Sequence, residues 1–323
     1  MAASGGGEGA ATAAPVVTTP ATIGAAAGAD TSATDAAAAT LTPTTGESSI
    51  VVYTLNNPFA DALRLPVRDI PLRGTSFRLR QHYRPDGKGG TSIGFGASVY
   101  NGAIVLADYV AREEVAAMHG MAGGCVVELG TGLGLVAMAL ARCARARRVI
   151  ATDGDAGVVE YAAEALAAND IAPTVATTAR LLWGDAGDEA AVAAAVAAAQ
   201  ATGGGDGDGG MVRRRCLPDA VVAADVVAAP YADHLPALVR TLQWLMGGAC
   251  TCPPAARCPP PSFLLAYQRR HGVERTWFRA MEAWCTVTRL PTTDLHPDFQ
   301  DAFPPLAIYV FTPTLGVPVA AAP

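Results

Sequence analysis

One segment constrains the fold of this chain more than any other, residues 125–153. It begins with a short Val-rich apolar run, which predicts a buried strand over 125–129. A glycine turn with the sequence GTGLG follows at 130–134, and an Ala-rich apolar run then predicts a helix to about Arg145. A second strand over 149–152 is expected to lead into an aspartate. Strand, glycine turn, helix, strand and acid together predict half of a nucleotide-binding α/β unit.

The spacing of the glycines and acids distinguishes between two kinds of ligand. A dinucleotide fingerprint needs a third glycine three positions after the second, and Leu135 stands there. Glu128 precedes the first glycine by two residues, where a carboxylate disfavours a pyrophosphate and favours an ammonium group. Asp153, after the second strand, can accept both hydroxyls of a ribose. A ribose and an amino group without phosphate describe S-adenosylmethionine. We therefore predict this cofactor, with Glu128, Gly130, Gly132, Gly134 and Asp153 in its site; the alternative is a glycine-rich turn without a ligand.

Apolar runs alternate between strand and helix lengths along the rest of the chain. We expect further strands near residues 77–81, 179–182, 219–227, 263–267 and 306–311, and helices over 94–110, 157–169, 190–199, 235–246 and 274–284. This alternation predicts a doubly wound, mostly parallel α/β sheet. Ligands bind such sheets at the carboxyl ends of the strands. Glu128, Asp153, Trp183 and Asp225 all stand at or just after expected strand ends, so we expect them in one site.

Composition sets the expected domain boundaries. Residues 1–49 are almost wholly Ala, Gly, Thr, Ser and Pro, and they lack the large apolar side chains that a core needs. We predict a disordered tail there, with order beginning near Val51. The expected organisation thereafter is one domain over residues 50–315 with an N-terminal extension at 50–110, flexible insertions at 201–215 and 247–261, and a second tail at 316–323.

The charge of the chain argues against two classes of partner. The formal net charge is −6 and the isoelectric point is near 5.4, which does not suit non-specific binding to nucleic acid or anionic membranes. No apolar run reaches the length of a membrane span. The N-terminal segment has neither the arginines of a transit peptide nor the apolar core of a secretory signal. We expect a cytoplasmic protein, with import into an organelle as the alternative.

The seven cysteines are scattered, as expected for thiols in a reducing compartment and not for a disulfide framework. Three of them, Cys250, Cys252 and Cys258, lie in the Pro-rich insertion. A structural metal site needs about four ligands at defined spacing. Because no fourth ligand stands nearby in the sequence, we predict an insertion loop and no metal.

Five segments between Phe77 and Phe311 resemble the methyltransferase-like 21 group, also called methyltransferase family 16. They are Tyr100-Asn101-Gly102-Ala103 before the glycine turn, Glu128 to Gly134, Thr152-Asp153, Leu181-Leu182-Trp183-Gly184 and Ala224-Asp225-Val226-Val227. The resemblance implies a class I, seven-strand, Rossmann-like protein lysine methyltransferase that uses S-adenosylmethionine. It also implies that Tyr100, Trp183 and Asp225 contact the cofactor, with Trp183 near the adenine.

The chain departs from the family pattern at two positions. Tyr100 replaces the usual tryptophan, and Ala228 replaces the tyrosine of the family's Asp-x-x-Tyr motif. Tyr231 follows one helical turn later and can restore an aromatic wall. We predict Asp225 and Tyr231 as catalytic residues, because an acid beside an aromatic wall can orient the neutral amine of a lysine. The alternatives are a helix cap for Asp225 and packing roles for Tyr231 and Trp183.

Other functions remain open from the sequence. Methyltransferases of nucleic-acid amino groups carry Asn/Asp-Pro-Pro-Tyr/Phe after the fourth strand, and residues 228–231, Ala-Ala-Pro-Tyr, lack the polar residue. A small-molecule acceptor is another alternative, and a non-catalytic binding module that retains the fold is a third. The expected partner is a protein substrate with an accessible lysine, bound by a monomer that contacts neither nucleic acid nor membrane.

Overall fold

The structure is a computed structural model that describes residues 62–63, 65–82, 95–201, 215–253, 257–269, 272, 274–302 and 304–314. These residues all belong to one unit of the chain, Leu55–Pro323. The tails predicted at 1–49 and 316–323, the expected start of order near Val51 and most of the predicted insertion at 201–215 lie outside the described residues. Within the described part of the chain, no helix is both long enough and apolar enough to cross a membrane.

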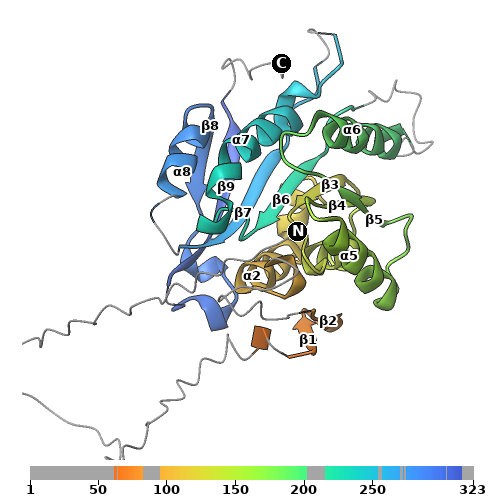
Figure 1. The fold of residues 1–323 in the computed structure, drawn as a ribbon, viewed down its shortest axis with the longest axis vertical. Helices are drawn as coiled ribbons and strands as arrows, with labels where there is room; N and C mark the ends of the chain where they lie inside the picture. The colour runs from red at the N-terminus through yellow and green to blue at the C-terminus, as the bar shows by residue number, and fades with distance from the viewer. Residues whose placement is uncertain are drawn as a thin grey trace, which may run out of the picture. The chain divides into compact units, whose positions relative to one another are not determined.

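A seven-stranded sheet forms the centre of the domain (Figure 1). Its order is β5-β4-β3-β6-β7-β9-β8. The strands are β3 (Cys125–Leu129), β4 (Arg148–Asp153), β5 (Ala176–Arg180), β6 (Ala220–Ala224), β7 (Ser262–Gln268), β8 (Cys285–Arg289) and β9 (Leu306–Pro313). Pairing from β5 through β7 is parallel, and β9 runs antiparallel to both of its neighbours. The doubly wound, mostly parallel, seven-strand sheet predicted from the sequence is therefore confirmed.

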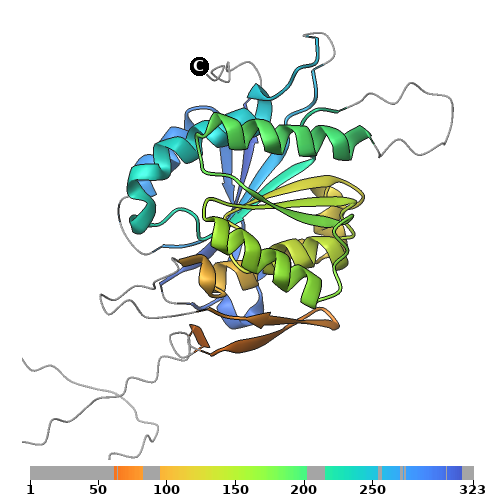
Figure 2. The same cartoon turned by 45° about the vertical axis from the view of Figure 1, so that its right-hand side comes forward.

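Helices cover both faces of the sheet (Figure 2). One face carries α2 (Asn101–Val110), α4 (Leu135–Arg142) and α5 (Ala156–Ala168), and the other carries α6 (Ala186–Ala201), α7 (Leu235–Gln243) and α8 (Glu274–Glu282). Strand β3 is buried on both faces, which explains why apolar and polar residues do not alternate along it. Val126 packs in the core under α2, α4 and α5, which we call the first core. Val127 and Leu129 pack in the second core, under α6, α7 and α8, because successive side chains of a strand point to opposite faces.

A small antiparallel sheet packs on the first core. It consists of β1 (Val67–Leu72) and β2 (Thr75–Arg80). Phe77 and Leu79 are fully buried and their neighbours are exposed, which confirms the alternation read from the sequence. The short helix α3 (Glu113–Met118) links α2 to β3. The sequence did not predict β1, α3 or β8; β1 contains a proline and two charged residues, which are uncommon in strands.

Two predicted strands have different bounds in the structure. The third strand was expected near 179–182, but β5 occupies Ala176–Arg180. β5 lies at one edge of the sheet and is half exposed. An edge strand can therefore be formed by threonines, and the apolar residues that follow lie outside it. The fourth strand was expected to reach Val227, but β6 ends at Ala224. Asp225 has a φ of 54°, a left-handed conformation that ends the extended backbone.

Candidate active site

A cavity of about 350 Å³ lies at the carboxyl ends of β3, β4 and β6, large enough for a small ligand. The strand order reverses between β3 and β6, which is the switch point where open α/β sheets bind ligands. Most of the predicted site residues line this one cavity: Tyr100, Glu128, Gly130, Gly132, Asp153, Trp183, Asp225 and Tyr231. The structure thus brings together residues from five separate segments of the sequence. Gly134 is the predicted site residue that does not line it.

The glycine turn owes its shape to backbone conformations and to close packing. Gly130 has a φ of 63°, and a Cβ there would lie 2.5 Å from Cγ1 of Val226, so no larger residue fits. Gly134 has a φ of 79° and is the N-cap residue of α4. Its role is to end the turn and to begin the helix, which explains why it stands outside the cavity.

Glu128 supplies a buried carboxyl group to the cavity wall. Its exposed fraction is 2%, and the hydroxyl of Thr131 donates a 2.7 Å hydrogen bond to its Oε2 atom. Burial raises the pKa of Glu128 to about 8, with the charge of Asp153 adding to the effect and hydrogen bonds from Thr131 and Ala137 opposing it. A cation bound nearby would favour the charged carboxylate. The site therefore holds a counter-charge suited to a ligand ammonium group.

Asp153 presents a second carboxylate to the same cavity. The backbone N–H of Gly132 donates to its Oδ2 atom at 3.2 Å, and that of Asp155 donates to Oδ1 at 3.3 Å. Burial raises the pKa of this group. A carboxylate oxygen has two lone pairs, so each oxygen can accept a further hydrogen bond, as two ribose hydroxyls require. Glu128 and Asp153 together suit the ammonium group and the ribose of S-adenosylmethionine.

Asp225, which directly follows β6, forms hydrogen bonds to both α2 and β7. Its Oδ2 atom accepts a hydrogen bond from the backbone N–H of Gly102 at 3.1 Å, and its Oδ1 atom accepts one from Gln268 at 3.2 Å. Gly102 is in the first turn of α2, so Asp225 helps to cap that helix. A Cβ on Gly102 would lie 2.5 Å from Oδ2, which explains the glycine. The predicted catalytic role of Asp225 stays a prediction beside this capping role.

Three aromatic rings meet at the opening of the cavity. Tyr231, in the 3-10 helix η2 (Ala229–His234), lies edge-on to Trp183 with ring centroids 6.1 Å apart. It also lies edge-on to Phe95 at 6.0 Å. Ala228 is buried in the same cavity wall, so Tyr231 provides the aromatic surface that Ala228 lacks. We call Phe95, Trp183 and Tyr231 the aromatic trio.

Sequence reasoning missed Phe95 as a site residue. It belongs to the 3-10 helix η1 (Phe95–Ala97), lines the cavity and is 40% exposed, unusual for a large apolar side chain. Its position between two glycines, just before the segment that begins at Tyr100, was the available signal. His234 also lines the cavity and was missed, since nothing in its local sequence distinguishes it.

Residues 86–198 match the model of a family described as lysine methyltransferases. This confirms the family resemblance over that span, which includes Tyr100, the glycine turn, Asp153 and Trp183. The match also supports S-adenosylmethionine, the cofactor predicted from the sequence. Asp225 and Tyr231 follow the matched span.

Solved structures with a similar fold are distant in sequence. SMU.776, a proposed methyltransferase complexed with SAH, and a proposed SAM-dependent methyltransferase from Streptococcus mutans each show 11% identity and a TM-score of 0.44. In each case the similarity covers 76% of this chain and 55% of the other, so this chain spans little more than half of their length. A proposed RNA methyltransferase from Pyrococcus horikoshii shows 12% identity and a TM-score of 0.40, over 74% of this chain and 93% of that one. No curated protein sequence matches the chain.

Proposed function

We propose that this chain is an S-adenosylmethionine-dependent methyltransferase that acts on the side-chain amine of lysine in a protein substrate. The observation that carries the proposal is the aromatic trio, which borders the same cavity as Asp225 and the two cofactor-facing acids. The faces of aromatic rings attract ammonium and methylammonium groups, and Trp and Tyr do so most strongly. The description of the matched family, lysine methyltransferase, supports the same acceptor.

One part of the cavity would bind the cofactor and the other would bind the acceptor lysine. Glu128 would hold the ammonium group of the cofactor, Asp153 its ribose hydroxyls, and Trp183 one side of its adenine. When bound, the cofactor supplies an activated methyl group on a sulfonium. Aligning donor and nucleophile at close range accounts for much of the catalysis in such a displacement. The domain therefore needs rigid walls at this point, and Asp225 provides rigidity by fixing α2 and β7 to the end of β6.

Asp225 would prepare the acceptor together with Phe95 and Tyr231, the two rings of the aromatic trio that are not assigned to the adenine. A lysine amine attacks only in its neutral form, and loss of hydration inside the cavity would favour that form. A second lone pair on an Asp225 oxygen can then accept a hydrogen bond from the amine and orient its nitrogen. The proton leaves through water at the open side of the cavity. The net charge of −6 would favour the approach of a basic protein segment.

Methyl transfer from tritiated S-adenosylmethionine into a cell extract tests the proposal. We expect label in protein, and acid hydrolysis of that protein should yield methylated lysine. The Tyr231→Ala variant should lose most of the label, whereas Tyr309→Ala, which alters a tyrosine packed on Phe278 outside the cavity, should retain it. Label in nucleic acid or in small molecules would contradict the acceptor class. Cofactor binding without any labelled product would identify a non-catalytic module.

A further inference from the structure

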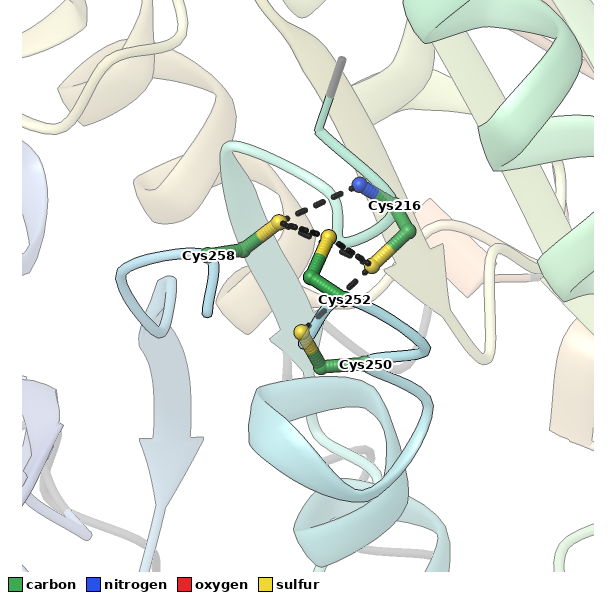
Figure 3. Close-up of side chains that lie close together, drawn as sticks. All are labelled: Cys216, Cys250, Cys252 and Cys258. Atoms are coloured by element: carbon green, nitrogen blue, oxygen red, sulfur yellow. Dashed lines mark hydrogen bonds between the residues drawn. The ribbon is translucent and has the colours of Figure 1, made fainter. Parts of the chain in front are cut away.

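Four cysteine sulfurs gather at one point of the structure. Cys216 comes from the segment before β6, and Cys250, Cys252 and Cys258 come from the segment between α7 and β7 (Figure 3). All four Sγ atoms lie within 4.8 Å of one another. The sequence-based expectation that three cysteines lack a nearby partner is therefore wrong. The missing ligand, Cys216, stands 34 residues before Cys250, and the pairing of β6 with β7 brings the two segments together.

The distances between the sulfurs suit a single ion. From Cys216, the Sγ atoms of Cys250, Cys252 and Cys258 lie at 3.5, 3.6 and 3.6 Å, and those of Cys252 and Cys258 lie 3.7 Å apart. A disulfide would need about 2.05 Å. Four thiolates at about 2.3 Å from a tetrahedral zinc ion lie about 3.8 Å from one another. In an iron–sulfur cluster the cysteines bind different irons and so spread further apart.

The surroundings of the cluster support a ligand role for its sulfurs. The backbone N–H of Cys216 donates to Sγ of Cys258 at 3.3 Å, a contact of the kind that orients and stabilises a metal-bound thiolate. Arg215 adds positive charge beside the cluster and joins its two segments. Its guanidinium donates to the carbonyl of Pro259 at 3.2 Å and pairs with Asp219 at 2.9 Å. Arg215 thus links the two segments that carry the four cysteines through a contact other than the sulfurs.

We propose that Cys216, Cys250, Cys252 and Cys258 bind one structural zinc ion. Four thiolates complete a tetrahedron and leave no position for a catalytic water. The cluster lies ahead of the first residues of β6 and β7, whereas the methyltransferase cavity lies at the opposite, carboxyl ends of the parallel strands. The ion therefore stabilises the two segments that lead into the sheet and takes no part in methyl transfer.

Metal analysis of the purified full-length chain tests this site. We expect one zinc per chain when the protein is purified under reducing conditions without chelator. Cys216→Ser and Cys258→Ser should each lose the zinc and lower the melting temperature by several degrees. Cys143→Ser is the matched control, because Cys143 is also a half-buried thiol but lies outside the cluster, and it should retain one zinc. Affinity for S-adenosylhomocysteine should be the same before and after removal of zinc with a chelator.

Cobalt substitution gives a second readout that does not depend on whether the variants fold. The wild-type chain loaded with Co²⁺ should show the intense visible bands of a tetrahedral site and near-ultraviolet thiolate-to-cobalt charge transfer. A reduced protein that contains no zinc and takes up neither zinc nor cobalt would overturn the proposal. So would unchanged zinc content in both cluster variants, or iron in place of zinc at the same stoichiometry.

Discussion

Replacing Glu128 by glutamine should remove from the cofactor site a carboxyl group whose protonation depends on folding and on ligand binding. In the unfolded chain this carboxyl group loses its proton near pH 4.5, whereas in the folded protein burial raises its pKa to about 8. Between these values the folded state holds a proton that the unfolded state has lost, so stability falls as pH rises. At 1.36 kcal/mol per pKa unit, the loss across this window is up to about 5 kcal/mol. The stabilising contribution is complete below pH 4.5 and is lost as pH passes through 8.

Cofactor binding should favour the deprotonated form of Glu128 instead of the protonated form. A ligand ammonium group pairs only with the charged carboxylate, so binding at pH 6.5 must expel the proton of Glu128. We expect wild-type protein to release about one proton for each S-adenosylhomocysteine bound at that pH, and affinity to rise up to tenfold per pH unit towards neutrality. The Glu128→Gln variant keeps the shape of the side chain and can still accept from Thr131. It should bind more weakly and release no proton.

Calorimetry in buffers of different ionisation enthalpy measures the proton release directly. The matched control is Glu189→Gln, because Glu189 is also a buried glutamate that accepts from a hydroxyl, that of Thr241 at 2.8 Å, yet lies outside the cavity. That variant should behave as wild type. Equal proton release by wild type and Glu128→Gln would refute the reasoning, since the carboxyl group would then not be the counter-charge of the ligand.

Four further perturbations test the acceptor side, the packing and the domain boundary. Asp225→Asn should leave the protein folded, at a cost of about 1–2 kcal/mol for its weakened cap, and should slow methyl transfer roughly 10²-fold; an unchanged rate would remove Asp225 from the acceptor site. Tyr231→Phe should cost less activity than Tyr231→Ala in the same assay. Gly102→Ala should destabilise the protein by about 1–3 kcal/mol in urea, because its Cβ would lie 2.5 Å from Asp225; equal stability would contradict the tight packing. A shortened chain beginning at Ser49 should keep its melting temperature and cofactor affinity, and a drop of many degrees would show that residues 1–48 support the domain.

Local sequence determined the centre of the fold well. The strand, glycine turn, helix and strand between Cys125 and Asp153 lie where the sequence predicts, because both faces of β3 are buried and only glycine suits the turn at Gly130. The edge strand β5 was misplaced by about three residues. Its threonines are half exposed, and the more apolar pair that follows, Leu181 and Leu182, lines the cavity instead.

Contacts between segments that are distant in the chain could not be predicted from the sequence. Asp225 could be placed at the end of a strand, but its hydrogen bond to Gly102 spans 123 residues and depends on α2 packing against the centre of the sheet. Phe95 joins the aromatic trio only because η1 lies over the cavity. The fourth cysteine of the cluster could not be predicted for the same reason: β6 and β7 are neighbours in space, but helix α7 separates them in the chain.

Binding of S-adenosylmethionine or S-adenosylhomocysteine to the purified chain tests the central claim most directly. Isothermal titration should give one site per chain with a dissociation constant in the micromolar range, about −8 kcal/mol. Asp153→Ala should weaken binding at least tenfold, because it removes the acceptor for the ribose hydroxyls. Asp298→Ala should bind as wild type, because Asp298 is an exposed residue of the 3-10 helix η6 (Pro297–Phe299) and does not line the cavity. Folded protein that gives no heat and no protection against thermal unfolding with either ligand would contradict the account.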